Sequence, residues 1–494
     1  MKPLSLLFAT VVTVLIPAPT FAATYVVRPD GTGDFPTIQE AIDATVDADT
    51  VELADGIFTG SGNRDIDYLG KAITVRSQNN DTETCVIDCE GTEADPHRGF
   101  FFQSGEGHES VLQAVTILNG YDDEVGGGIV CSGSSPSIMG CTLTDNIAVL
   151  GCGLFAWNSS PTLTSCTFSG NGGDLSSHEN GEGGGLSCHE SSLTLTDCIF
   201  SENSAGSGGG IFSWNCALEL QGCTFSGNVA TEGWETGIGG GMYCYGGSLM
   251  LTDCLFRNNT AGWMGGAVVV WSISIPTFTD CEFSANSAAI EGGANYWDQS
   301  SPKLTSCVFH ENSAVHNGGA AYGHASSPTF TSCTFSENTA GIGGALAGSY
   351  YSTSTLLGCT FSRNRADDGS GMSCDENSAF MLYDTIIAFG VQGSAVYCHD
   401  TGSTVTGTCC DVYGNSGGDW VGCIEDQQAS NGNFSDDPLF CDIYAGDLRL
   451  CANSPCLPEH SPCEELIGAH GEGCGNCDTA ARTVTWGGIK AEFR

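Results

Sequence analysis

The sequence predicts an all-β fold, a parallel β-helix in which each coil contains three short strands. First, a Cys-x-Phe-x-x-Asn pattern recurs nine times between Cys141 and Asn364, at intervals of 25 to 32 residues, with Leu143 in place of phenylalanine in the first copy. Second, glycine pairs or triplets follow the asparagine in seven of the nine copies, and short alternating segments follow them. Third, three strands in about 26 residues leave no room for a crossover helix. We therefore expect strands that stack coil upon coil.

Each part of the repeat has a predicted place in the coil. The cysteine and the phenylalanine lie two residues apart on one strand, so both point to the same face, and the apolar phenylalanine makes that face the interior. The asparagine falls at a turn, where its amide can hydrogen-bond to the amides of neighbouring coils. Glycine supplies the positive φ of the next turn. We interpret the repeated Asn and Gly residues as structural.

Composition and charge exclude several partners. The 494 residues include 14 Lys+Arg and 58 Asp+Glu, a formal charge of −44, and no basic residue lies between Arg98 and Arg257. A nucleic-acid surface needs a row of cations, which this chain does not supply. Anionic membrane surfaces are disfavoured for the same reason. A cationic ligand, a divalent metal or a neutral sugar remains compatible with the charge.

The first residues have the pattern of an export signal. Lys2 precedes an apolar run from Leu4 to Ile16, and small residues before Ala22 suit a signal peptidase. We expect cleavage after Ala22. The run is too short to span a membrane, and no later stretch is long enough. The expected location is therefore secreted or at the outer cell surface.

Domain boundaries follow from these patterns. We expect a signal peptide over 1–22, an N-terminal strand and capping helix over 23–50, the β-helix over 51–425, a Cys-rich cap over 426–480 and a tail over 481–494. Thr37-Ile-Gln-Glu40 is a capping-box pattern, with Ile38 and Ile42 on one face of the helix that follows.

The 27 cysteines are an odd number, so at least one thiol is free or paired outside the chain. Those near the C-terminus indicate a disulfide-stapled cap, and we expect Cys474 and Cys477 to serve structural disulfides rather than a metal half-site. The repeat cysteines leave three alternatives open. They are disulfides between neighbouring coils, stacked thiols, or in-coil bridges such as Cys131 with Cys141.

The Phe-x-x-Asn and Gly-Gly-Ala pattern resembles the repeats of chlamydial polymorphic outer-membrane proteins over residues 120 to 375. These are right-handed parallel β-helix proteins, so the resemblance implies a right-handed coil and surface exposure in a Gram-negative-type bacterium. The stretch from Tyr25 to Asp43 is similar to the start of secreted β-helix proteins that include pectin methylesterases. That likeness implies export and carbohydrate contact.

A search for the catalytic residues of β-helix enzymes finds none. Gln113-Ala-Val matches only a fragment of the methylesterase motif, and the Asp-bearing motif is absent. The acidic pairs at 122–123 and 367–368 lack the accompanying basic residues of polygalacturonases and lyases. The sequence therefore leans against an enzyme.

One surface is predicted to bind a ligand. In the strand after each glycine pair, the second and fourth residues face outward and are often aromatic. We propose that these rings stack on sugars. The candidate residues are Phe155, Trp157, His189, Phe212, Trp214, Tyr243, Tyr245, Trp271, Tyr296 and Tyr322.

Two longer turns, 172–182 and 229–238, flank these strands. They carry His178, Glu179, Glu182, Glu232, Trp234 and Glu235, which we expect at the rim of the surface. The alternative is that the aromatic surface is covered, by those turns or by a neighbouring chain, and serves packing.

The sequence thus favours an exported or cell-surface, adhesin-like binding protein whose partner is a polysaccharide, a surface glycan or a surface protein. The alternatives are a carbohydrate-active lyase, esterase or hydrolase, and a structural spacer. No cofactor is expected, although the acidity leaves a Ca²⁺ site open. Nucleic acid is not expected as a partner, nor is a transmembrane segment.

Overall fold

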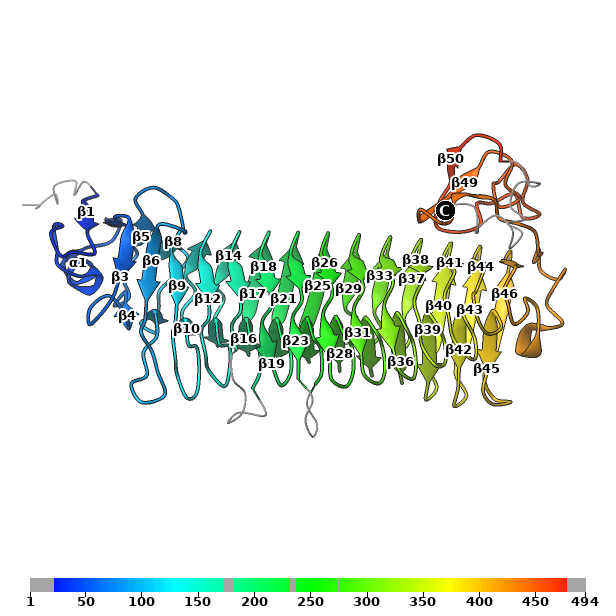
Figure 1. The fold of residues 1–494 in the computed structure, drawn as a ribbon, viewed down its shortest axis with the longest axis horizontal. Helices are drawn as coiled ribbons and strands as arrows, with labels where there is room; N and C mark the ends of the chain where they lie inside the picture. The colour runs from blue at the N-terminus through cyan, green and yellow to red at the C-terminus, as the bar shows by residue number, and fades with distance from the viewer. Residues whose placement is uncertain (1–21, 173–180, 232–236, 273–274, 478–494) are drawn as a thin grey trace, which may run out of the picture.

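The computed structural model describes residues 22–172, 181–231, 237–272 and 275–477. They form an elongated parallel solenoid whose strands stack in rows along its length, with a separate irregular unit at the C-terminal end (Figure 1). The expected all-β fold with three strands in each coil is confirmed. Residues 1–21 and 478–494, with His178, Glu179, Glu232, Trp234 and Glu235, lie outside the described residues.

The first long sheet, sheet A, has 15 parallel strands in the described chain. They are β1 (Thr24–Val27), β2 (Thr50–Leu53), β5 (Thr74–Ser77), β8 (Val111–Gln113), β11 (Ser137–Met139), β14 (Thr162–Thr164), β17 (Ser192–Thr196), β21 (Ala217–Gln221), β25 (Ser248–Thr252), β29 (Thr277–Thr279), β33 (Lys303–Thr305), β37 (Thr329–Thr331), β40 (Thr353–Leu357), β43 (Ala379–Tyr383) and β46 (Thr404–Thr408).

Sheet B follows sheet A within each coil and has 14 strands in the described chain. They are β3 (Gly56–Phe58), β6 (Cys85–Asp88), β9 (Thr116–Leu118), β12 (Thr142–Thr144), β15 (Thr167–Ser169), β18 (Ile199–Ser201), β22 (Thr224–Ser226), β26 (Leu255–Arg257), β30 (Glu282–Ser284), β34 (Val308–His310), β38 (Thr334–Ser336), β41 (Thr360–Ser362), β44 (Ile386–Ala388) and β47 (Asp411–Tyr413).

Sheet C follows the glycine pairs and has 13 strands in the described chain. They are β4 (Ile66–Asp67), β7 (Phe100–Phe102), β10 (Ile129–Ser132), β13 (Leu154–Trp157), β16 (Leu186–His189), β20 (Ile211–Trp214), β24 (Met242–Tyr245), β28 (Val268–Trp271), β32 (Asn295–Asp298), β36 (Ala321–His324), β39 (Leu346–Ser349), β42 (Met372–Cys374) and β45 (Val396–Cys398). Between sheets B and C lie five two-residue strands: β19 (Ser204–Ala205), β23 (Val229–Ala230), β27 (Thr260–Ala261), β31 (Ser287–Ala288) and β35 (Ser313–Ala314).

Two ladders of identical side chains run through the interior, as the repeat predicts. Phenylalanine rings from Phe168 to Phe361 stack face to face, with centroids 4.5 to 5.2 Å apart. The nine repeat asparagines, from Asn146 to Asn364, are buried. Each of the first eight donates its Nδ2 to the Oδ1 of the next at 2.9 to 3.0 Å. The amide ladder therefore fixes the register of successive coils.

The corner before each repeat cysteine is left-handed. Asp197, Asp253 and Asp280 have φ of 52° to 53°, and Gly222 at the same corner has φ of 64°. Short polar residues and glycine tolerate this conformation better than bulky ones. This explains the small or acidic residue that precedes the repeat cysteine.

Both ends of the solenoid are capped. Helix α1 (Ile38–Ala44) begins after Thr37, whose hydroxyl accepts a hydrogen bond from the Glu40 amide, and it buries Ile38 and Ile42, as the capping box predicts. At the other end, the cap contains η2 (Gly422–Ile424), β48 (Phe440–Asp442), β49 (Asp447–Cys451) and β50 (Glu472–Cys474). It folds back over the last strands of sheet B, where apolar cap residues pack on Ile386 and Ala388 (Figure 1).

The cysteines divide into two classes. Four disulfides join Cys398 to Cys423, Cys409 to Cys463, Cys441 to Cys474 and Cys451 to Cys477. The remaining cysteines, including every repeat cysteine, are buried free thiols. Of the three open alternatives, the structure contains the stacked thiols. Contact with the Cys166 thiol, together with burial, raises the pKa of the Cys198 thiol to about 12. Cys474 and Cys477 form structural disulfides, but with partners other than each other.

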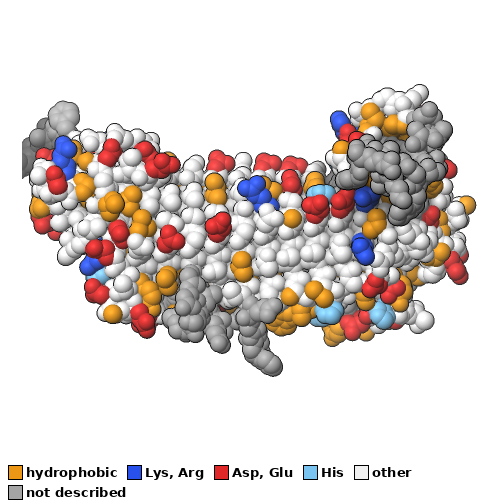
Figure 2. Space-filling view, viewed as in Figure 1, with side chains coloured by type: hydrophobic (Ala, Val, Ile, Leu, Met, Phe, Trp, Pro, Cys, Tyr) orange, Lys and Arg blue, Asp and Glu red, His pale blue; other side chains and the backbone are white. Residues whose placement is uncertain are grey.

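The surface is strongly acidic. Figure 2 shows Asp and Glu side chains along the whole length of the visible face and only a few Lys or Arg side chains. In the described part of the chain, no helix has the length and apolarity needed to cross a membrane.

Candidate functional site

Two columns of side chains stand on the outer face of sheet C. Parallel pairing brings the second residue of each strand beside the second residue of the next, and the fourth beside the fourth. The second-position column contains Phe155, Phe212, Tyr243, Tyr296 and Tyr322, and the fourth-position column contains Trp157, His189, Trp214, Tyr245 and Trp271. The structure therefore brings all ten sequence-predicted candidates onto one face.

The second-position column is largely covered. Phe212, Tyr296 and Tyr322 have only 2%, 5% and 8% of their surface exposed. The two tyrosines belong to an apolar cluster with Ile238 and Val269, against which Trp263 and Met264 of the preceding turns also pack. These rings stabilise the turns over sheet C, and only their edges are available to a ligand.

The fourth-position column is the accessible one. Trp157 and Trp214 are 52% and 42% exposed. The rings of Trp214 and Tyr245 stack with centroids 4.5 Å apart and an angle of 15° between their planes, and Trp271 continues the row 6.5 Å from Tyr245. Trp214 and Tyr245 thus pack face to face, Trp271 is tilted by 51° to Tyr245, and the three rings form a partly exposed apolar platform.

A buried polar pair interrupts the platform at His189. The imidazole lies between Phe155 and Phe212, with ring centroids at 5.5 and 5.7 Å. Its Nε2 is 3.1 Å from the Ser187 hydroxyl and 3.6 Å from Glu182 Oε2. Burial raises the pKa of Glu182 to about 7 and lowers the pKa of His189. Burial therefore favours the neutral form of both groups.

This pair gives a prediction for stability against pH. Because the folded pKa of Glu182 is raised above the ordinary value of 4.5, its neutral form favours folding below that value, and this contribution is lost as the pH rises through about 7. Glu182→Gln keeps the group neutral, so its melting temperature is expected to fall less than that of the parent between pH 5 and pH 8. The measurement is thermal unfolding of both proteins across that range. Equal slopes would contradict the assignment.

Beyond Trp271 the fourth-position column becomes polar. The next two strands carry Asp298 and His324, and the strand after them carries Ser349. Beside Ser349 is a pocket of about 200 Å³. Its lining residues are Asn317, Tyr322, Ile342, Ala347, Gly348, Ser349, Ser373, Cys374, Asp375 and His399. Sequence reasoning missed Ser349 because the strand Leu346–Ser349 has no aromatic residue.

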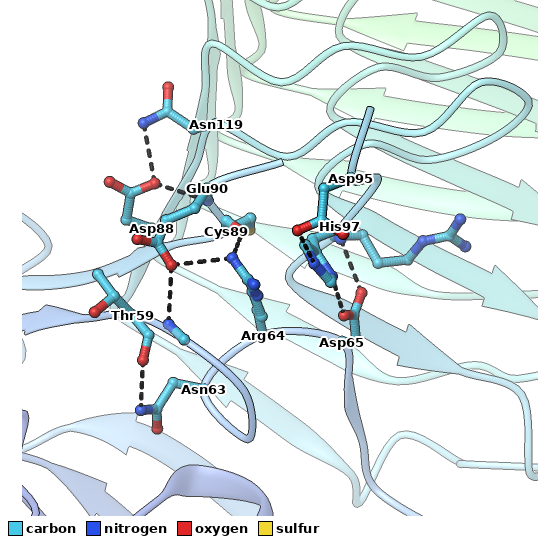
Figure 3. Close-up of polar contacts among 12 residues, drawn as sticks. Thr59, Asn63, Arg64, Asp65, Asp88, Cys89, Glu90, Asp95, His97 and Asn119 are labelled. Carbon is cyan, nitrogen blue, oxygen red and sulfur yellow. Dashed lines mark hydrogen bonds and ion pairs between the residues drawn. The ribbon is translucent and has the colours of Figure 1, made fainter. Parts of the chain in front are cut away.

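A separate polar network ties together the first coils (Figure 3). His97 lies between two carboxylates, with Nδ1 2.6 Å from Asp65 Oδ2 and Nε2 3.3 Å from Asp95 Oδ2. Arg64 bonds to Glu90 at 3.0 Å and to the Cys89 carbonyl at 3.0 Å. These contacts join turns of successive coils, so we interpret them as structural.

Other acidic candidates are engaged in local contacts. Asp122 pairs with Arg98, and Asp367 accepts a hydrogen bond from Gln392. Gln113 donates to Asn80 on the surface, as expected of an ordinary strand residue.

Two groups in the described chain have metal-ligating residue types. In the first, the sulfurs of Cys441, Cys451 and Cys474 lie close together, but they are consumed in disulfides. The second contains His310, Glu311 and Glu337, and Arg363 donates to Glu337 at 3.1 Å. Because Arg363 already supplies positive charge to Glu337, the arrangement of these three residues does not by itself indicate a metal site.

Comparison with solved structures gives likeness at low identity. The catalytic unit of a thermostable α-1,3-glucanase from Streptomyces thermodiastaticus is 12% identical, with a TM-score of 0.46, over 78% of this chain and 66% of that one. The chain thus spans slightly less than two thirds of that catalytic unit. A mannuronan C-5 epimerase A-module from Azotobacter vinelandii is 15% identical, with a TM-score of 0.37, over 75% of this chain and 95% of that one. Pectate lyase Pel9A is 13% identical, with a TM-score of 0.25, over 92% of this chain and 97% of that one. Likeness at this level carries no argument about substrate.

No curated protein matches the sequence significantly. The family described as the right handed beta helix region matches residues 116–261, 235–343 and 267–433. Together these stretches cover more than half of the chain, and they include the asparagine ladder, the glycine pairs and the ring platform. The chain therefore belongs to the right-handed β-helix family.

Proposed function

We propose that this protein is an exported or cell-surface binding protein that holds a glycan on the outer face of sheet C. The observation that carries the proposal is the row of rings in the fourth-position column, in which Trp157 and Trp214 are exposed and Tyr245 and Trp271 are half-buried. Rings at successive coils are spaced at about 4.8 Å, so an extended sugar chain can lie along the row and make apolar contact with several of them.

The second-position residues have a supporting role in this proposal. Phe155 and Tyr243 are half-buried, and Phe212, Tyr296 and Tyr322 are buried beneath the turns. They hold the turns against the sheet and form one wall beside the exposed rings. His189 contributes a ring in the middle of the row, between two aromatic neighbours.

Charge favours a neutral or cationic glycan over a polyanionic one. In the described chain none of the strands of sheet C carries Lys or Arg, and the overall charge is −44. A polyuronate would be repelled by this field, whereas a neutral polymer would not. The same acidity makes a surface protein with basic patches the second class of partner.

Export completes the proposal. We propose that residues 1–22 direct secretion and that the mature chain begins with the strand and helix that cap the first coil. The disulfide-stapled cap suits a compartment in which disulfides persist. The likeness to chlamydial surface repeats supports an adhesin-like placement outside the cell.

The test is retention on a panel of insoluble and immobilised polysaccharides. The parent is expected to be retained on at least one neutral polymer, and Trp214→Ala is expected to weaken binding by about tenfold, since one ring contributes about 1–2 kcal/mol. Tyr383→Ala is the matched control because Tyr383 is similarly exposed but lies on sheet A. Two results would contradict the proposed face. In one, Trp214→Ala and Tyr383→Ala weaken retention equally; in the other, neither variant changes it.

A further inference from the structure

Three consecutive coils place an acid, an imidazole and a hydroxyl in one row. Asp298 ends β32, His324 ends β36 and Ser349 ends β39, and parallel register pairs Asp298 with His324 and His324 with Ser349. Adjacent strands lie about 4.8 Å apart, so the three side chains are immediate neighbours on the outer face of sheet C. Trp271 precedes them in the same column. The row therefore begins where the ring platform ends.

The carboxylate and the imidazole are in close contact but without hydrogen-bond geometry: Asp298 Oδ1 and His324 Nδ1 are buried and lack hydrogen-bond partners. Asp298 is 6% exposed, and its Oδ2 lies 3.2 Å from His324 Nδ1. On its other side the imidazole stacks on Tyr350, with centroids 5.1 Å apart and planes within 14°. Because Nδ1 is buried while about a third of the His324 side chain is exposed, Nε2 is the nitrogen left for proton transfer. A carboxylate this close to Nδ1 can accept its hydrogen bond after a small rotation of the ring, as catalytic groups often do when substrate binds.

The hydroxyl faces a pocket that can hold a small group. Ser349 lines the cavity of about 200 Å³ together with Ala347, which takes the position that Tyr322 has in the preceding coil. The Ser349 hydroxyl is 2.6 Å from the hydroxyl of Tyr322. Burial raises the pKa of Tyr322 to about 12, so that group stays protonated and can donate a hydrogen bond at neutral pH. Both groups therefore lie at the mouth of an acyl-sized space.

We propose that Ser349, His324 and Asp298 form an esterase site that removes small acyl groups, such as acetate, from hydroxyls of a neutral glycan. The Ser349 hydroxyl turns from Tyr322 to His324, loses its proton to Nε2 and bonds to the ester carbon. The carbon–alkoxy bond breaks, and the proton on Nε2 passes to the departing sugar hydroxyl. Water then repeats the sequence, releasing the acid and restoring Ser349.

The remaining groups have defined parts in this reaction. Tyr322 is placed to donate a hydrogen bond to the oxygen that becomes negative in the tetrahedral intermediate. Asp298 is a positioning residue, because it acts through His324. The acidic pocket, which includes Asp375, favours a neutral acyl group and expels the anionic product. The identity of the substrate as a glycan ester rests on the function proposed above. The ability to hydrolyse an ester does not depend on it.

The first test is covalent labelling with a fluorophosphonate, in which the serine oxygen bonds to phosphorus and fluoride departs. Mass spectrometry of the labelled protein is expected to place the adduct on Ser349. Ser349→Ala is expected to abolish it, and His324→Ala to slow it about 100-fold or more. Ser354→Ala, at a buried serine in β40 of the same coil, is expected to label at the parental rate. Absence of an adduct on Ser349, with the native melting temperature retained, would overturn the proposal.

The second test is hydrolysis of p-nitrophenyl acetate, which requires no glycan. The parent is expected to hydrolyse it, with the rate lost in Ser349→Ala. Asp298→Asn is expected to lower kcat with little change in KM or in melting temperature, a pattern that a merely structural carboxylate would not give. Hydrolysis that persists in Ser349→Ala would contradict the site. Because the ester is small, failure of glycan binding and failure of the esterase are distinguishable.

Discussion

Asn259→Ala is expected to destabilise the middle coils by about 3–6 kcal/mol, because it breaks the amide ladder at its centre. The buried Asn259 side chain accepts from the backbone and the side chain of Asn228 and donates to Asn286 and to the Phe225 carbonyl. Alanine leaves the buried Asn228 donors without this acceptor and removes one hydrogen bond from the Phe225 carbonyl. Each such group costs about 1–3 kcal/mol, more than the loss of an exposed hydrogen bond.

The measurement is the denaturation midpoint, supported by amide hydrogen exchange in the coils on either side of Asn259. Asn258→Gly is the matched control: Asn258 is the exposed neighbour, and glycine keeps its positive φ of 55° without strain. We expect that control to shift the midpoint slightly and to leave exchange unchanged. If the two variants were equally stable, the ladder would not be what fixes the coils.

Gly240→Ala is expected to cost about 3 kcal/mol or more, because no space exists for its side chain. A Cβ at this position would meet the Gly266 carbonyl of the next coil and would lie 2.5 Å from the Thr260 carbonyl oxygen. Both obstacles are backbone atoms, so no side-chain rotation can relieve them. The coil would have to separate from its neighbour, with loss of the hydrogen bonds between them.

Gly140→Ala separates this effect from backbone strain. Gly140 has φ of 58°, but a Cβ there would meet nothing within 4 Å. We expect that variant to lose about 1–2 kcal/mol, the cost of a left-handed residue with a side chain. Chemical denaturation of the two variants beside the parent gives the comparison. A Gly140→Ala loss as large as that of Gly240→Ala would contradict the assignment of the larger cost to the lack of space at Gly240.

Most of the fold was predictable because every copy of the repeat predicts the same strands and turns. The inward phenylalanine, the asparagine at the turn and the capping box at Thr37 each follow from local patterns, and the structure confirms them. Alternation of side chains also placed the candidate rings on one face. What alternation does not give is burial, because Tyr296 and Tyr322 belong to an apolar cluster drawn from several coils, against which the turn residues Trp263 and Met264 also pack.

The thiol state and the polar end of the face were not predictable from spacing. In-coil pairs such as Cys131 with Cys141 have a regular separation, yet both are free. Ser349 belongs to a strand with no aromatic residue, and only the register beside His324 gives it a chemical neighbour. Both outcomes depend on how coils stack, which a single repeat does not encode.

The central claim is that the fourth-position rings bind an extended glycan. The most direct test is to measure how binding affinity depends on the length of the oligosaccharide. Calorimetric titration with oligosaccharides of a retained neutral polymer is expected to show affinity that rises with length until the chain spans about 19 Å, the distance over four coil spacings from Trp157 to Trp271. A variant with alanine at Trp157, Trp214 and Trp271 is expected to lose that rise. Affinity that is independent of length, and equal in the parent and the triple variant, would contradict the account.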